Sequence, residues 1–432
     1  MLLPLCDLPR SMQITSRSSG RVLPVRLWTV CLVALVMGPV LAAGADWPRF
    51  RGPNGSGVAT DAKVPVEFAP QDAQWKTAIP GTGHSSPVAC NGKIYLTTAI
   101  DKGAQRLLLC LDLKTGKKIW EAQSPGGVGH THQKNSLASG TPFATADRVF
   151  VPSWNGDKVH LTAYTTEGKE IWDRDLGGFT SQHGPGHSPV LLGKTVIFVN
   201  EQDGSAAILG LDAETGKTVW ETPRQAARTC YSTPFSHERA NGTVEVVVAS
   251  TTGIGGYDPA TGNENWLWKW TGNSLRTVGS PIESQGMVLV SSGNGGNDRH
   301  AVAVRLDGQG KVPESFLVWE NRKGFPYVPS MVASGDYLFF VNDKGFAGCH
   351  SLKTGEQIWS ERLGGTFTAS LILVNDKVYA INEAGKVYVF AAAPAYQLLA
   401  TNDLGESVYA TPAVADGHLL IRTWEHLYSF GK

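Results

Sequence analysis

The chain has little charge and no excess of either sign. Charged residues make up 18% of its 432 residues, and 38 Lys and Arg balance 38 Asp and Glu. Proteins that bind nucleic acid carry a basic patch or stripe, and binding to anionic membranes also needs concentrated positive charge. The composition therefore predicts that nucleic acid is not a partner and gives no reason to expect an anionic membrane as one.

Cysteine is also scarce, and its spacing fits no chemical motif. Of six cysteines, none are adjacent and none form Cys-x-x-Cys; Cys90, Cys110, Cys230 and Cys349 follow residue 45. Widely spaced cysteines are typical of small buried apolar side chains, although the spacing leaves one disulfide open. The chain also lacks Gly-x-Ser-x-Gly, His-Glu-x-x-His and the calcium-loop spacing. No catalytic motif therefore identifies an enzyme.

One long apolar run is present, and it lies near the N-terminus. Arginines precede "LWTVCLVALVMGPVLAA", and "AGA" before Asp46 provides a small-residue cleavage site. This order predicts a signal peptide over residues 1–45, and hence an exported protein, periplasmic or secreted, with no membrane span after cleavage. An uncleaved anchor is the alternative. Residues 46–71 are expected to form an N-terminal extension.

Glycine (49) and tryptophan (13) are abundant and are arranged in repeats. A Ser/Thr-Pro pair, or a degenerate form of it, opens an apolar stretch eight times at intervals of 40 to 55 residues. A second marker closes many of the same units, as in "DLKTGKKIW" at 112–120 and "DAETGKTVW" at 212–220. Self-similarity at this period is typical of sheets that stack side by side.

The repeats predict an all-β fold, an eight-bladed β-propeller of four-stranded blades over residues 72–432. The last unit has only three strands, so a strand around Trp75 is expected to join it and close the ring with N- and C-terminal strands. A seven-bladed ring would leave one of these segments unpaired. Large side chains on the outermost strands are expected to pack on the neighbouring blade. These structural blade tryptophans are Trp75, Trp120, Trp172, Trp220, Trp319 and Trp359.

These units resemble the PQQ-like (quinoprotein-type) repeat over roughly residues 72–432, and "DWPRFRGPNGSG" at the predicted mature start is similar to exported bacterial propellers of that family. The resemblance implies one of two classes. Quinoprotein dehydrogenases hold a quinone and calcium on the propeller axis, whereas BamB-type propellers bind no cofactor and serve as scaffolds for exported proteins. The chain looks like the second class, because it has no Cys-Cys pair, no haem-attachment motif and no long insertions.

The loops that lead into the innermost strands are expected to converge at one mouth of the central channel. Their histidines, cations and aromatic rings suit an anionic or sugar-like ligand. The candidate ligand-binding residues are His84, His132, Lys134, Asn135, His183, His187, Arg228, Tyr231, Arg276, Tyr327 and Tyr409. The alternative is that they only satisfy backbone groups at strand ends. A metal bound by the histidines is disfavoured, because the alternate residues of "HTH" point apart on an extended chain.

The sequence therefore predicts an exported, non-catalytic binding or scaffold module for a protein or saccharide partner, with no cofactor and no metal. The alternative is a PQQ-dependent quinoprotein dehydrogenase that oxidises an alcohol or aldose with calcium. A third hypothesis is a metal-dependent enzyme that uses His132 and His187. A near-complete repeat architecture without a catalytic motif favours the first of these.

Overall fold

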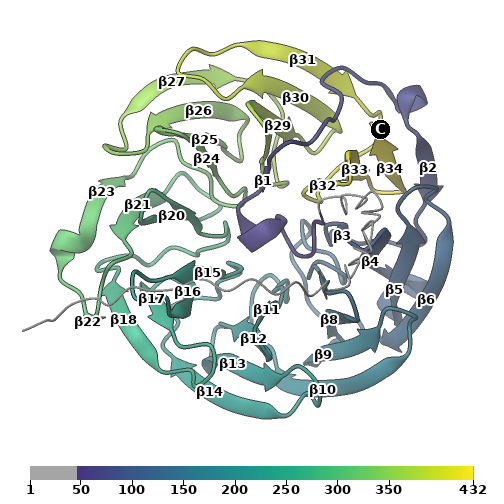
Figure 1. The fold of residues 1–432 in the computed structure, drawn as a ribbon, viewed down its shortest axis with the longest axis horizontal. Helices are drawn as coiled ribbons and strands as arrows, with labels where there is room; N and C mark the ends of the chain where they lie inside the picture. The colour runs from purple at the N-terminus through teal and green to yellow at the C-terminus, as the bar shows by residue number, and fades with distance from the viewer. Residues whose placement is uncertain (1–45, 432) are drawn as a thin grey trace, which may run out of the picture. The chain divides into compact units, whose positions relative to one another are not determined.

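The computed structural model describes residues 46–431, and within them the chain is almost entirely β-structure. Eight sheets are arranged around a central axis, as Figure 1 shows. The four short 3-10 helices are η1 (Pro53–Gly55), η2 (Pro70–Asp72), η3 (Asp101–Gly103) and η4 (Glu314–Phe316). The prediction of an eight-bladed β-propeller is confirmed. The predicted signal peptide, residues 1–45, lies outside the described residues.

The first four blades follow one another along the chain, each with four consecutive antiparallel strands. Blade 1 contains β3 (Val88–Cys90), β4 (Lys93–Ile100), β5 (Gln105–Asp112) and β6 (Lys118–Pro125). Blade 2 contains β7 (Phe143–Ala144), β8 (Arg148–Trp154), β9 (Lys158–Thr165) and β10 (Glu170–Gly178). Blade 3 contains β11 (Val190–Leu192), β12 (Thr195–Asn200), β13 (Ala206–Asp212) and β14 (Thr218–Arg224). Blade 4 contains β15 (Phe235–Glu238), β16 (Val244–Ala249), β17 (Gly253–Tyr257) and β18 (Glu264–Lys269).

The other four blades complete the ring. Blade 5 contains β19 (Ile282–Ser284), β20 (Met287–Gly293), β21 (Arg299–Arg305) and β23 (Leu317–Asn321). Blade 6 contains β24 (Val332–Ser334), β25 (Tyr337–Val341), β26 (Phe346–Ser351) and β27 (Gln357–Arg362). Blade 7 contains β28 (Ile372–Val374), β29 (Lys377–Ile381), β30 (Lys386–Ala391) and β31 (Leu398–Asp403). Blade 8 contains β32 (Ala413–Ala415), β33 (His418–Arg422), β34 (His426–Phe430) and, from the other end of the domain, β2 (Trp75–Ala78).

The ring closes where β2 pairs with β34. The two strands are antiparallel, with Trp75 opposite Ser429. Glu406, in the loop before blade 8, accepts hydrogen bonds from Lys76 of β2 at 2.9 Å and from Tyr428 of β34 at 2.7 Å. Backbone pairing and a shared carboxylate therefore hold the two ends of the ring together, so no strand edge is left open at the seam.

The Ser and Thr residues of the first marker lie next to the central axis of the ring. The hydroxyl oxygen of six of these eight residues accepts the backbone N–H of the equivalent residue in the preceding blade. These six bonds, at 2.9–3.0 Å, run from Ser86 to Thr141, Thr141 to Ser188, Thr233 to Ser280, Ser280 to Ser330, Ser330 to Ser370 and Ser370 to Thr411. They satisfy buried N–H groups that no strand pairs, and so they join the blades at the centre of the ring.

The tryptophans of the second marker lie on the outermost strands, at the rim of the ring. Each of the six predicted tryptophans donates its indole N–H to a backbone carbonyl of the next blade at 2.8–3.1 Å; the acceptors are Leu113, Thr166, Ala213, Pro259, Leu352 and Ala393. In the first of these pairs, Gly116 has a φ of 66°, and a Cβ there would lie 2.4 Å from the ring of Trp75. The glycine of the Thr-Gly turn therefore serves both the turn and the indole that packs on it.

Two additions interrupt the regular pattern. In blade 4, Trp266 donates instead to the buried carboxylate of Glu245, and β22 (Gly310–Lys311) pairs in parallel with the outer edge of β18. In blade 7, β1 (Val58–Ala59) pairs in parallel with the innermost strand, β28. Both additions cover strand edges that the other blades leave exposed.

Residues 46–59 cross the centre of the ring at the end of the inner strands opposite the mouth loops; η1 lies there in Figure 1. Trp47 forms a bridge with Ala89 of blade 1, and the buried guanidinium of Arg51 donates to the carbonyl of Met331 in blade 6. Asn54 exchanges hydrogen bonds with Ser236 of blade 4. The segment predicted as an extension is thus packed against blades on several sides of the axis.

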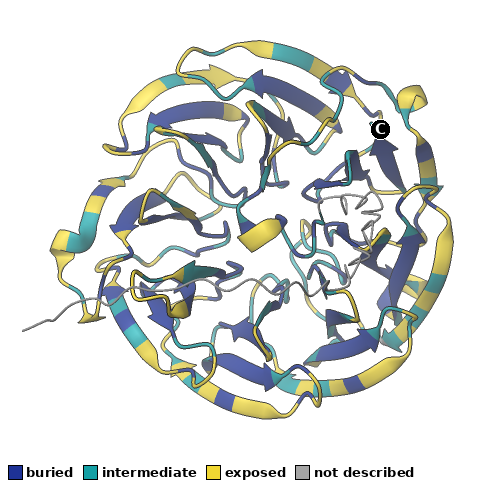
Figure 2. Cartoon of the chain, in the orientation of Figure 1, coloured by how far each residue is buried: buried dark blue, intermediate teal, exposed yellow. Residues whose placement is uncertain are grey.

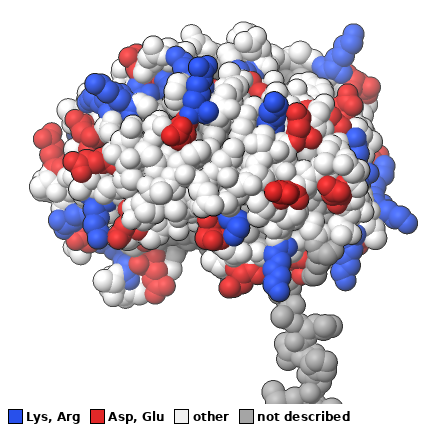
Figure 3. Space-filling view, turned by 90° about the horizontal axis from the view of Figure 1, so that it is seen from above, with Lys and Arg blue, Asp and Glu red and all other residues white. Residues whose placement is uncertain are grey.

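The apolar core lies between neighbouring blades; one buried cluster, for example, joins Leu289 and Trp319 of blade 5 with Leu338 and Phe340 of blade 6. Figure 2 shows buried residues within each blade and exposed ones mainly along the outermost strands. The four cysteines beyond residue 45 are buried and unpaired. The side of the ring seen in Figure 3 carries both signs of charge, interspersed. Within the described residues, no helix has the length and apolar character needed to cross a membrane.

Candidate functional site

The mouth of the channel holds a cavity of about 750 Å³. Its walls come from two kinds of loop: those that lead into the innermost strands of blades 2–7, and the turns between the second and third strands of blades 5 and 6. Below it, a narrower hollow of about 150 Å³ follows the axis between the Ser/Thr residues. Phe50 lines this hollow, because the N-terminal segment crosses the ring there. The cavity is therefore open at the mouth and closed toward the far end.

The structure brings eight of the eleven predicted site residues together around this cavity. They are His132, Lys134, Asn135, His183, Arg228, Tyr231, Arg276 and Tyr327. His84 and Tyr409 line the narrow hollow instead. His187 lines neither space; it is buried between blades, where its Nε2 donates to the carbonyl of Cys230 at 2.6 Å.

Positive charge dominates the lining of the cavity. Its walls include five cationic side chains, Lys134, Arg228, Arg276, Arg299 and Lys344, and one carboxylate, Asp343. Charges in a recessed site with low-dielectric walls act more strongly than charges on an open surface. The cavity is thus suited to an anion.

Of the cavity cations without a close carboxylate partner, Arg276 is the most buried. It is 6% exposed, and its Nη2 donates to Gln182 at 3.0 Å. The nearest carboxylate oxygen, on Asp203, lies 3.8 Å from that nitrogen, and the other oxygen of Asp203 accepts the N–H of Thr229 at 2.7 Å. The buried Nε of Arg276 has no hydrogen-bond partner among residues 46–431. A donor left unpaired at this depth costs free energy unless a ligand or water satisfies it.

Arg228 is exposed at the rim of the cavity, and its guanidinium has no hydrogen bond or ion pair among residues 46–431. Lys134 and Lys344 differ, because Lys134 pairs with Glu383 at 2.6 Å and Lys344 donates to Asn297. Burial by itself would raise the pKa of Glu383, but hydrogen bonds from Lys134, Thr368 and Thr366 lower it, so this carboxylate stays charged. Among residues 46–431, Arg228 and Lys344 therefore have no carboxylate partner, and Arg276 has one only at 3.8 Å.

Arg299 and Asp343 brace the wall between blades 5 and 6. Arg299 donates to Asp343 at 3.2 Å and to the carbonyls of neighbouring loops, and its guanidinium lies 5.7 Å from the ring centre of Tyr327. Asp343 also accepts the backbone N–H groups of Tyr327 at 2.7 Å and Val328 at 3.1 Å. These contacts fix the orientation of Tyr327, so its ring is a rigid part of the wall.

Two histidines meet on the opposite wall. The ring centres of His132 and His183 lie 5.0 Å apart, and Asn135 holds the two loops together by donating to the carbonyl of His183 at 2.6 Å. Burial, followed by the charge of Arg276, lowers the pKa of His183. Within residues 46–431, no set of three metal ligands forms here. His187, the second histidine of the metal hypothesis, is not in this group, so the described geometry does not bring the two proposed ligands into the cavity.

The remaining candidates pack against other rings. His84 stacks on Tyr409 with ring centres 4.6 Å apart, and His187 stacks on Tyr231 at 5.3 Å. Burial lowers the pKa of both His84 and His187 to about 4. Both imidazoles are therefore neutral at pH 7 and act as packing surfaces for the aromatic side chains around the mouth.

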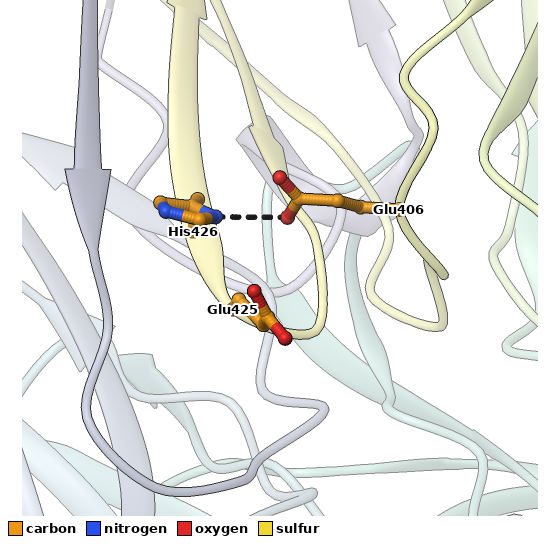
Figure 4. Close-up of side chains that lie close together, drawn as sticks. All are labelled: Glu406, Glu425 and His426. Carbon is orange, nitrogen blue, oxygen red and sulfur yellow. Dashed lines mark hydrogen bonds and ion pairs between the residues drawn. The ribbon is translucent and has the colours of Figure 1, made fainter.

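One set of three potential metal ligands occurs among the described residues, at Glu406, Glu425 and His426 (Figure 4). Glu406 already accepts hydrogen bonds from Thr423, His426 and Tyr428, in addition to Lys76. Burial works against its ionisation, but these bonds hold the pKa of Glu406 at about 2. The carboxylate is thus fully used in closing the ring.

The donor set of the cavity does not fit a calcium-bound quinone. Calcium takes six to eight oxygen ligands, several of them usually carboxylates. Among the described lining residues, the sole carboxylate is Asp343, and its oxygens are occupied by Tyr327, Val328 and Arg299. A divalent cation would also lie among the five positive side chains.

Sequence analysis missed Arg299, Asp343 and Lys344. The segment "GNGGNDRH" and Asp343 lie in the turns between the second and third strands of blades 5 and 6. Turns between second and third strands lie on the same face as the loops into the first strands. The alternation of antiparallel strands predicts this, and it is the signal that would have found all three residues.

Comparison with known proteins assigns the family. A family model described as "Outer membrane protein assembly factor BamB" matches residues 104–361, more than half of the chain. The protein of that name from Yersinia pestis is 22% identical to the chain over 330 residues. The one from Xanthomonas campestris pv. campestris is 27% identical to the chain over 245 residues. These matches cover 70% and 44% of the chain, and 75% and 57% of the two relatives.

Solved structures show the same fold. BamB from Moraxella catarrhalis superposes with a TM-score of 0.57 at 14% identity, covering 82% of the chain and 98% of that protein. A quinohemoprotein alcohol dehydrogenase from Comamonas testosteroni superposes with a TM-score of 0.53 at 13% identity, covering 90% of the chain and 80% of that protein. Both structures therefore share this architecture, and the family is assigned by the sequence match. The chain belongs to the family described as outer membrane protein assembly factor BamB.

Proposed function

We propose that the chain is an exported, non-catalytic binding module that uses its mouth cavity to hold an anionic part of a protein or saccharide partner. The observation that carries this proposal is the excess of cations around the cavity, with Arg228 unpaired and the buried Nε of Arg276 unsatisfied. A rigid ring supports every wall of the site, so little ordering is needed when a ligand binds.

The relatives support the same class of function. Two relatives are named as outer membrane protein assembly factors, and the family match extends over six of the eight blades in whole or in part. We propose that this chain likewise acts in the cell envelope or outside the cell. A shared fold does not fix the partner, so its partner need not be that of its relatives.

We further propose that the protein works without PQQ or another cofactor. The lining of the cavity offers positive charge where a calcium centre needs oxygen ligands. A polyvinylalcohol dehydrogenase from Pseudomonas is 24% identical to the chain, but over only 162 residues, or 24% of that enzyme. This match covers about a third of the chain and less than a third of the enzyme, so it gives little support to a dehydrogenase.

A capture experiment tests the proposal. The full chain, immobilised, is exposed to envelope extract and to polysaccharide from the same cells, and bound material is compared between two double variants. Arg228→Glu with Lys134→Glu reverses charge at the mouth, whereas Lys117→Glu with Lys217→Glu makes the same change in exposed turns on the opposite face. Capture should be lost in the first variant and retained in the second.

Equal capture by both double variants would contradict the proposal. So would saturable PQQ binding with calcium, accompanied by oxidation of an alcohol or aldose with a redox dye. The first result would move the binding surface away from the mouth, and the second would return the chain to the dehydrogenase class.

A further inference from the structure

We propose that the ligand of the mouth cavity is a short acidic oligosaccharide, a chain of a few sugar rings that carry carboxylates. This inference rests on the proposed function and deepens it by naming the chemical class of the ligand. The inference comes from three properties of the cavity taken together: its volume, the two guanidinium groups of Arg228 and Arg276, and the polar and aromatic groups on its other walls.

The size of the cavity favours a small ligand over a protein surface. About 750 Å³ lies within the range of small-molecule sites, roughly 300–1,000 Å³, and the narrow hollow and Phe50 close it below. A stable protein–protein interface covers about 800 Å² on each partner and is nearly flat. A deep pit of this volume therefore accommodates a few linked rings and does not accommodate a folded partner.

The charges favour carboxylates held by arginine. A guanidinium is planar and forms two parallel hydrogen bonds to a carboxylate, which an ammonium group does not do. Three cations of the cavity lack a close carboxylate partner, and two of them are arginines, Arg228 at the rim and Arg276 inside. The third, Lys344, donates to Asn297. Arg276 is already oriented by Gln182, so the ligand need not order it.

The other walls favour sugar rings. Tyr231 and Tyr327 present aromatic rings, and both are held in place: Tyr231 bonds to Ser181 at 2.7 Å and Tyr327 is braced by Asp343. Aromatic faces pack on the C–H faces of sugars, while Ser139, Thr368 and Asn294 offer hydroxyl and amide groups to ring hydroxyls. An extended peptide would instead be recognised by pairing with a strand edge, and the cavity walls are loops.

Calorimetric titration of the full chain with trigalacturonate tests the inference. Maltotriose is the neutral control and triglutamate is the acidic peptide control. We expect saturable binding of trigalacturonate that weakens as salt rises, and at least tenfold weaker binding of both controls. Arg276→Gln and Arg228→Gln should each weaken the binding by about 10- to 100-fold, the loss expected when a hydrogen bond to a charged group is removed. Lys217→Gln, on the opposite face, should leave it unchanged.

Arg276 is buried, so its variant is accompanied by a thermal melt, and the exposed Arg228 supplies the second variant if Arg276→Gln is unstable. Equal binding of maltotriose, or tighter binding of triglutamate, would overturn the inference. So would an absence of trigalacturonate binding. If mouth-dependent capture of an exported protein persisted in that last case, the proposed function would stand without the saccharide; if capture were lost as well, both would fail.

Discussion

The two faces of the ring, at opposite ends of the inner strands, differ in what their side chains do. At the far end the chain repeats itself, because the Thr-Gly turn of one blade receives the indole of the blade before it, and the N-terminal segment closes the axis. The mouth end also repeats turns, as in "NDKG" at 342–345 and "NEAG" at 382–385, and it additionally carries the cations and aromatic rings that line the cavity. The repeated positions thus support the ring, and the candidate binding groups gather at the mouth.

The difference also appears in how carboxylates are used. In the far-face turn of blade 1, Asp112 accepts the N–H and hydroxyl of Thr115 within the same turn, at 2.8 and 2.7 Å. At the mouth, Asp343 of blade 6 accepts N–H groups from the loop that leads into that blade and a hydrogen bond from Arg299 of blade 5. Asp112 is used within one turn, whereas Asp343 also joins two blades, so only the contact with Arg299 depends on the assembled ring.

The largest effect should come from the repeated positions. Trp172→Ala should lower the free energy of unfolding by about 3–5 kcal/mol, because it removes a buried ring and its hydrogen bond to Ala213. Trp424, 42% exposed, is the matched control and should cost far less. Thermal and urea melts measure both. Similar losses for the two would show that the outer ring of tryptophans has no special part in stability.

Acid should destabilise the ring through its buried imidazoles. In the folded protein the pKa of His187 is held at about 4 by burial, below the ordinary value of about 6.5. The unfolded chain therefore binds a proton more readily, so stability is full above pH 6.5 and falls as the pH drops toward 4. The loss at pH 4 should be on the order of 3 kcal/mol for this group.

His187→Gln should flatten that dependence, since Gln keeps a donor for Cys230 but does not titrate. His84 has the same lowered pKa and should retain its own share of the acid response. Urea melts between pH 7 and 4.5 measure the slope. A slope unchanged by His187→Gln would show that its imidazole is not the group responsible.

The ring of hydroxyl groups at the axis should contribute less to stability than the ring of tryptophans at the rim. Ser330→Ala removes the oxygen that accepts the N–H of Ser280 at 2.9 Å and leaves that buried N–H unpaired, at a cost of about 1–3 kcal/mol. Ser330→Thr keeps the oxygen and is the control. If Ser330→Ala were as stable as the native chain, the hydroxyl ring would not be a means of joining blades.

Two substitutions with small effects on stability should show the clearest difference between the far face and the mouth. Asp112→Ala and Asp343→Ala should each cost about 1 kcal/mol, because each removes accepted hydrogen bonds. Only Asp343→Ala should also weaken trigalacturonate binding, since it releases Tyr327 and Arg299 from the cavity wall. Titration and melts of the pair provide the comparison. Equal affinity in both variants would show that the wall does not need this brace.

Much of this architecture followed from local pattern. The strand content, the number of blades and the closing role of the strand at Trp75 were all predicted from markers within single repeats, because each marker makes its contacts at the same place in every blade. The prediction of the mouth residues depended on the same logic and placed eight of eleven side chains around one cavity. His187 lies outside it because the loop turns its ring inward, which no repeat position encodes.

Three features were decided only in the tertiary structure. Arg299 and Asp343 enter the cavity from turns that are distant in sequence from its other walls. The N-terminal segment closes the axis through contacts with residues 40 to 315 positions away, such as Ala89 and Leu373. The isolation of Arg276 from a full counter-charge depends on where Asp203 lies. A repeat in sequence specifies a repeated contact, whereas burial, charge balance and the depth of a cavity exist only once the blades surround the axis.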